Sequence, residues 1–140
     1  MLLNTAYLLL NASKKLKYNL NQTMEHYGLT AQQWAVIQRI GQSEESLTAG
    51  QISQSLVIDK QTLSGIIKRL EEKNLIVRHR VPTDRRAFLL HLSSDEEKDL
   101  RLYKKASEEV LEQFLSPLTL TERETLDHLL SKLQYEGENG

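Results

Sequence analysis

The chain has 140 residues, of which 39% are hydrophobic and 26% charged, and its formal net charge is −1 at pH 7. This length suits one domain with a buried core, and no stretch reaches the roughly 18 apolar residues that a membrane-spanning helix needs. The sequence has no cysteine, which excludes disulfides, thiolate ligands and thiol-based oxidation sensing. At the start an apolar run precedes the basic residues, the reverse of a secretory signal. We therefore expect a cytoplasmic protein without membrane association.

The small net charge hides a segregation along the chain. Residues 51–92 carry eight Lys and Arg against four acidic residues, whereas residues 93–140 carry six against twelve. A basic middle followed by an acidic C-terminal third indicates one surface for a polyanion and another with a different role. Charge alone leaves open that both are ordinary solvated faces.

The apolar residues follow a helical period along most of the chain. This period predicts helices over 2–26, 31–42, 49–56, 60–73, 95–115 and 122–135. Alternation of side chains along two short arms predicts a hairpin over 76–81 and 87–92. Four of these helices begin at a capping box, in which a hydroxyl and a carboxylate or amide satisfy helix N–H groups. The boxes are Thr30–Gln33, Thr48–Gln51, Ser94–Glu97 and Thr121–Glu124. Gly28, Gly41 and Ser116-Pro117 mark helix ends. The prediction is a mostly helical α+β fold.

The two helices over 49–56 and 60–73 predict a helix–turn–helix. Apolar residues at helical spacing form one buried stripe on the second helix: Leu63, Ile66, Ile67 and Leu70. Asp59 can cap this helix. Its opposite face is polar and basic, with Gln61, Ser64, Gly65 and Lys68, and Thr62 lies on one flank. Such a face can enter the major groove of DNA, although an ordinary amphipathic surface helix has the same pattern. Lys60 and Gln51 are further candidate contacts.

The hairpin concentrates positive charge around a turn at Pro82-Thr83-Asp84. Its arginines are Arg78 and Arg80 on the first arm and Arg85 and Arg86 after the turn. Charged hairpins also protect sheet edges from pairing. However, a basic hairpin directly after a helix–turn–helix is typical of a wing, whose tip arginine fits the narrow, negatively charged minor groove. The position in the chain therefore favours a winged helix-turn-helix.

The stretch AGQISQSLVIDKQTLSGIIKRLEEKNLIVRHRVPTDRRAFLLHLS, residues 49–93, resembles the MarR family of bacterial transcriptional regulators. The motifs are IIKRLEEKNLI at the end of the recognition helix and the D-x-R wing motif at Asp84-Arg85-Arg86. Asn74 stands where the family usually has Gly, and Asn tolerates the left-handed conformation.

The resemblance implies a single MarR-like domain over 1–140, with a winged helix-turn-helix over 30–92 and dimerisation helices over 1–27 and 95–135. It implies a homodimer that binds a palindromic operator in double-stranded DNA and, in many members, a small-molecule effector. By resemblance, Gln61, Thr62, Ser64 and Lys68 face the major groove, Arg86 enters the minor groove, and Asp84 orders the wing. The candidate DNA-binding residues are Gln51, Lys60, Gln61, Thr62, Ser64, Gly65, Lys68, Arg78, Arg80, Thr83, Asp84, Arg85 and Arg86.

The sequence offers no pattern for a metal site, a cofactor or catalysis. The histidines His26, His79, His91 and His128 are scattered, with no carboxylate or second histidine at helical spacing. No nucleophile–base arrangement, paired carboxylates or Gly-rich phosphate loop is present. We therefore expect neither enzymatic activity nor a bound metal or cofactor.

The end helices carry more apolar surface than one thin helical arm can bury, including Phe114, Leu126, Leu129 and Leu133. Dimerisation would cover it and supply the two-fold symmetry of a palindromic site, whereas packing within one chain is the alternative. We favour a sequence-specific DNA-binding regulator, a repressor released by a small molecule. The alternative function is a winged-helix module for protein–protein assembly without specific DNA binding.

Overall fold

The computed structural model describes residues 2–94 and 96–136. In chain order the elements are α1 (Leu2–Glu25), α2 (Ala31–Gln42), β1 (Leu47–Thr48), α3 (Ala49–Leu56), α4 (Lys60–Glu72), β2 (Ile76–Val81), β3 (Asp84–Leu92), α5 (Glu96–Phe114), α6 (Leu120–Ser131) and the π-helical turn η1 (Lys132–Glu136). The mostly helical α+β prediction is confirmed. No helix in these two ranges has both the length and the apolar character that crossing a bilayer requires.

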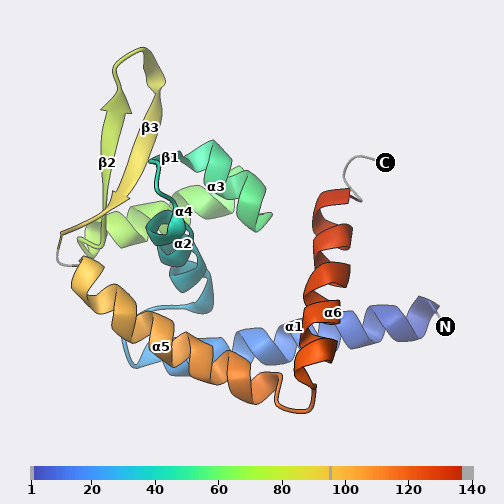
Figure 1. Ribbon diagram of the computed structural model, residues 1–140. Coiled ribbons are helices and arrows are strands. Elements are labelled where there is room, and N and C mark those ends of the chain that lie inside the picture. Colours follow the sequence, from blue (N-terminus) through green and yellow to red (C-terminus); the bar gives the residue numbers. More distant parts are fainter. Residues whose placement is uncertain (1, 95, 137–140) are drawn as a thin grey trace.

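Figure 1 shows a winged body, made of α2, α3, α4 and the sheet, above a pair of long helices, α1 and α5, that lie side by side. One core joins the two parts. Met24 of α1, Ile37 of α2, Leu63 of α4 and Leu90 of β3 are all fully or almost fully buried in it. Tyr103 of α5 adds edge-to-face ring contacts, with centroids 5.2 Å from Tyr27 and 5.9 Å from Trp34. These contacts fix the winged body on the long helices.

The wing belongs to a three-stranded antiparallel sheet of order β1-β3-β2. The predicted hairpin is present, with Ile76 opposite Leu92 and Arg80 opposite Phe88. The prediction was wrong about two details of the sheet. Strand β3 begins at Asp84 instead of residue 87, and a third strand, β1, was missed. Strand β1 covers the outer edge of β3 by pairing the buried Leu47 with Leu90.

The helix starts follow the predicted capping boxes at two of the four positions. Thr30 and Thr48 each accept a hydrogen bond from the N–H three residues later, and the Gln at that position accepts from the cap N–H. At α6 the prediction was wrong, because the box is Thr119 with Glu122 and the helix starts at Leu120 instead of residue 122. The predicted box at Ser94–Glu97 falls partly outside the described residues. Asn74 adopts the left-handed conformation as predicted, with φ 62°.

Candidate nucleic-acid interface

Helix α4 presents a polar face to solvent because its apolar stripe is buried. Leu63, Ile66, Ile67 and Leu70 all lie in the core, as the sequence predicts. The predicted outward residues Lys60, Gln61, Thr62, Ser64, Gly65 and Lys68 are all exposed. A side chain added at Gly65 would meet no atom within 4 Å, so this part of the face is open to an approaching molecule.

Asp59 caps α4 and also orients one of the candidate DNA contacts. One carboxylate oxygen accepts the Thr62 N–H at 2.8 Å, and the other accepts the Thr62 hydroxyl at 2.7 Å. These bonds, the backbone bond first, favour the charged carboxylate and lower the pKa of Asp59. Since the Thr62 hydroxyl already donates to Asp59, its oxygen can only accept a hydrogen bond from a ligand.

Helix α3 offers less to a ligand than its sequence suggests, because three of its polar side chains make hydrogen bonds within the fold. The side-chain oxygen of Gln51 accepts the Thr48 N–H at 2.9 Å, so this candidate DNA contact is held at the start of the helix with its amide N–H groups available to donate. The Ser55 hydroxyl is 2.9 Å from Nε of Arg39, and the Ser53 hydroxyl donates to the carbonyl of Ile58.

Arg78 of the wing is bound to the recognition helix, a pairing that the sequence analysis missed. Its Nε lies 3.0 and 3.1 Å from the two carboxylate oxygens of Glu71, and a second guanidinium nitrogen also contacts that carboxylate. The guanidinium stands over Phe88 with its carbon 5.0 Å from the ring centre. Glu71 therefore offsets the charge of Arg78. Arg78, a candidate DNA-binding residue, holds the wing against α4 through this ion pair.

Among the remaining candidate DNA-binding residues of the wing, three have described side chains and two do not. Arg80, Thr83 and Asp84 are exposed, and Asp84 begins β3 opposite Val81. The side chains of Arg85 and Arg86 lie outside the described residues, although their backbone belongs to β3. The assignment of Arg86 to the minor groove therefore stays a prediction.

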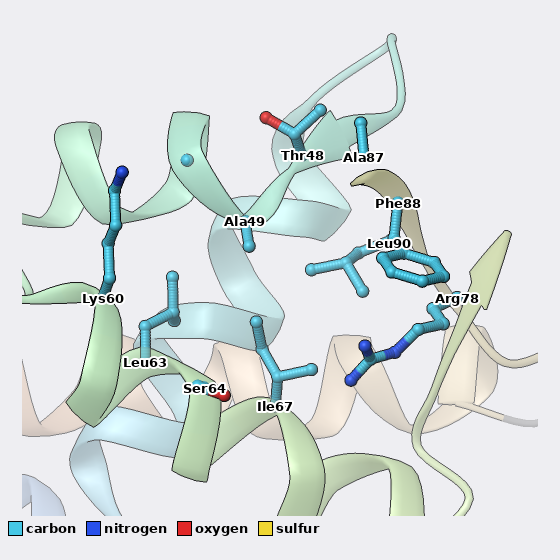
Figure 2. Close-up of a pocket in the computed structure, with 11 residues that line it drawn as sticks. Thr48, Ala49, Lys60, Leu63, Ser64, Ile67, Arg78, Ala87, Phe88 and Leu90 are labelled. Carbon is cyan, nitrogen blue, oxygen red and sulfur yellow. The ribbon is translucent and has the colours of Figure 1, made fainter. Parts of the chain in front are cut away.

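A hollow of about 380 Å³ lies between the recognition helix and the wing. Figure 2 shows its walls: the start of α3 on one side, α4 below, and β2 and β3 on the other. Leu63, Ile67 and Leu90 contribute apolar lining, while Lys60 and Arg78 contribute cationic groups. Because Glu71 offsets Arg78, the positive charge of this largely apolar hollow comes from Lys60. The hollow continues the exposed face of α4 towards the wing, and Lys60 can contact the sugar-phosphate backbone of a nucleic acid there.

Two histidines lie together, so the prediction that the four are scattered was wrong for this pair. His79 on β2 and His91 on β3 have ring centroids 4.8 Å apart, with an angle of 70° between the rings. They are diagonal neighbours, because His79 pairs with Leu89 and Val77 pairs with His91. Helical spacing could not reveal them, since the hairpin register brings them together.

Comparisons with known proteins agree with this geometry. A sequence profile described as the MarR family matches residues 27–87. The HTH-type transcriptional regulator MgrA of Staphylococcus aureus is 30% identical over 126 residues, which cover 89% of this chain and 84% of MgrA. A putative transcriptional regulatory protein for the hcr operon of Thauera aromatica is 30% identical over 106 residues, 76% of this chain, and the match spans 63% of that regulator's length.

A solved structure extends the likeness to the fold. Bordetella bronchiseptica BpsR superposes with a TM-score of 0.84 at 25% identity, over 93% of this chain and 92% of BpsR. That structure is described as showing the mechanism for regulation of BpsR's DNA binding by 6-hydroxynicotinic acid.

Proposed function

Because this chain belongs to the MarR family of transcriptional regulators, we propose that it is a homodimeric repressor that binds a palindromic operator in double-stranded DNA. The observation that carries the proposal is the exposed polar face of α4 beside a basic hairpin, with a hollow lined in part by Lys60 between them. Members of this family are regulators of transcription and not enzymes.

Helix α4 enters the major groove with its N-terminal turns, where Gln61 and Ser64 contact base edges. Lys60 and Lys68 contact phosphates on either side of these residues, and Thr62 accepts a hydrogen bond. The wing lies along the adjacent minor groove, with Arg80 near the backbone and Arg86 in the groove.

Dimerisation brings two such surfaces to the two halves of a palindrome. Helix α6, which is described throughout, has no buried residue, although Leu129 and Leu130 are apolar. On α1 the large apolar residues Leu3, Tyr7, Leu8 and Leu10 are likewise exposed. A second copy of the chain would cover both surfaces.

A small molecule that weakens operator binding completes the proposal, because the DNA binding of BpsR, a structural relative, is described as regulated by 6-hydroxynicotinic acid. No cofactor is required for DNA binding of this kind.

The test is binding to the DNA upstream of the protein's own gene, measured by fluorescence anisotropy over a series of salt concentrations. We expect the logarithm of affinity to fall linearly with the logarithm of salt, by about 0.9 for each phosphate neutralised. If the protein binds no better at low salt than an acidic control protein, the DNA-binding function is wrong and the protein–protein module becomes the favoured reading.

Variants separate the roles within the surface. Arg86→Ala should weaken binding to operator and unrelated DNA alike, whereas Gln61→Ala or Ser64→Ala should cost about 1–3 kcal/mol for the operator alone. Lys105→Ala, on α5 and outside the proposed surface, serves as the control for charge removal. Unchanged operator affinity of Arg86→Ala at physiological salt would remove the wing from the interface.

A further inference from the structure

His79 and His91 are a pair of imidazoles that the proposed DNA contacts do not use. They project from the face of the hairpin opposite Ile76 and Leu90, because side chains alternate along each strand. His79 is exposed and His91 half-buried, so both can be reached from solvent.

The separation of the two rings suits a shared metal ion. Two imidazoles that bind one tetrahedral Zn²⁺ through nitrogen at about 2.0–2.1 Å have ring centres about 5 Å apart. The centroids of His79 and His91 are 4.8 Å apart in an edge-to-face arrangement, so binding requires the rings to rotate until a nitrogen of each faces the ion, with no change of the hairpin register. Imidazole nitrogen is a preferred ligand of Zn²⁺, Ni²⁺ and Cu²⁺, and a poor one for hard ions such as Mg²⁺.

The loop before β1 supports the pair from outside. The Ser46 hydroxyl is 3.3 Å from each ring nitrogen of His91, and rotation of the ring would let it hydrogen-bond one nitrogen while the other binds an ion. Glu44 and Glu45 line the same hollow as Ser46 and His91, and their carboxylates offset part of the positive charge of the hairpin on this side.

We propose that His79 and His91 form a surface site for a divalent transition-metal ion on the wing. Within residues 2–94 and 96–136, no cluster of three or more His, Asp or Glu is arranged to hold a metal ion. The ion therefore takes two protein nitrogens and water at its remaining positions, one protein ligand fewer than an open catalytic zinc site has. The bound ion cross-links β2 to β3 and adds positive charge at the wing.

The experiment is a titration of the full-length protein with Zn²⁺, followed by calorimetry and by imidazole NMR signals. We expect one site per chain, with the signals of His79 and His91 shifting together, and no such shift with Mg²⁺. His79→Gln and His91→Gln should each weaken Zn²⁺ binding by at least about tenfold. His26→Gln and His128→Gln are the matched controls and should bind as the unmodified protein does.

Two results would overturn the site. One is the absence of Zn²⁺ binding up to about 1 mM in the unmodified protein, and the other is unchanged binding in both His79→Gln and His91→Gln. Because His79 is exposed, its variant should retain the circular dichroism spectrum of the folded protein, which separates loss of a ligand from loss of the fold. The titration contains no DNA, so its result does not depend on the proposed regulatory function.

Discussion

Val57, which links α3 to α4, has φ 53° and lies in the left-handed region, where a β-branched side chain is strained. Val57 is 68% exposed, so removing its side chain loses little buried apolar surface. We expect Val57→Gly to raise the free energy of unfolding by about 1 kcal/mol, since Gly adopts this conformation without a Cβ clash. Urea denaturation at fixed protein concentration measures the change.

Asn74 provides the matched control for Val57. It has a similar φ of 62°, but Asn tolerates the left-handed region better than most residues. Asn74→Gly should therefore stabilise the protein less than Val57→Gly does. Equal gains, or a loss for Val57→Gly, would mean that the turn is not strained.

Asp59 makes the stability of the protein depend on pH through its cap on α4. Hydrogen bonds from Thr62 hold its pKa below the ordinary value of 3.8, so the folded state favours the charged carboxylate. This contribution is complete above the ordinary pKa of Asp and is lost as pH falls through the lowered pKa. The stability advantage over Asp59→Asn should thus be constant near neutrality and shrink below about pH 4 in urea titrations. An advantage independent of pH would contradict the charged cap.

At the scale of the elements, the Arg78–Glu71 pair determines how the wing sits on α4. Because the carboxylate of Glu71 already offsets the guanidinium, we expect Arg78→Ala to change the salt dependence of DNA binding less than Arg80→Ala does. Arg80→Ala should reduce the slope by about one phosphate contact. Anisotropy titrations on the same operator compare the two variants, and a larger effect of Arg78→Ala would show that Glu71 releases Arg78 when DNA binds.

The sequence predicted those elements whose signals are local. The stripe from Leu63 to Leu70 and the cap at Asp59 identified α4, because helix period and capping act within a few residues. Strand β1 could not be predicted from the sequence, since two residues are too few to show an alternating pattern. They form a strand only because they pair with β3. At α6 two overlapping patterns, Thr119–Glu122 and Thr121–Glu124, both fit a capping box, and local sequence does not decide between them.

In the candidate nucleic-acid interface, too, the sequence predicted the features that depend on local pattern and missed those that depend on non-local contacts. Exposure of Gln61, Ser64 and Lys68 followed from the helical period. The contacts of Arg78 with Glu71 and of His79 with His91 depend on the hairpin register and on the packing of the hairpin against α4. Such non-local geometry gives no repeat or spacing that a single sequence reveals.

For the whole molecule, the distribution of charge and apolar surface separates two roles. The basic residues gather in 51–92, which contains α4 and the wing, whereas the acidic excess lies in 93–140, which contains α5 and α6. An acidic C-terminal part repels DNA, so these helices are better suited to contact protein than operator. The turn η1, which follows α6, contacts the winged body directly, because Gln134 donates to the Ser55 carbonyl at 3.1 Å.

The dimer is best tested by charges placed on α6 and on the turn η1 that follows it. Leu129 and Leu133 are 51% and 64% exposed in the single chain, so Leu129→Glu with Leu133→Glu should leave its fold intact. In the dimer both side chains would be buried, and the double variant should raise the dissociation constant at least about a hundredfold through lost apolar burial and buried charge. Sedimentation velocity over a range of concentrations measures this change.

Val77→Glu on the wing is the control, since Val77 is also exposed but remote from the end helices in sequence. It should dimerise as the unmodified protein does.

Truncation after Pro117 should also abolish the dimer, but it removes the Gln134–Ser55 bond as well, so the point variants are more informative. The double variant should lose operator affinity along with dimerisation, because one winged body reads only half a palindrome. A double variant that remained a dimer with full operator affinity would exclude this face of α6 and η1 from the interface.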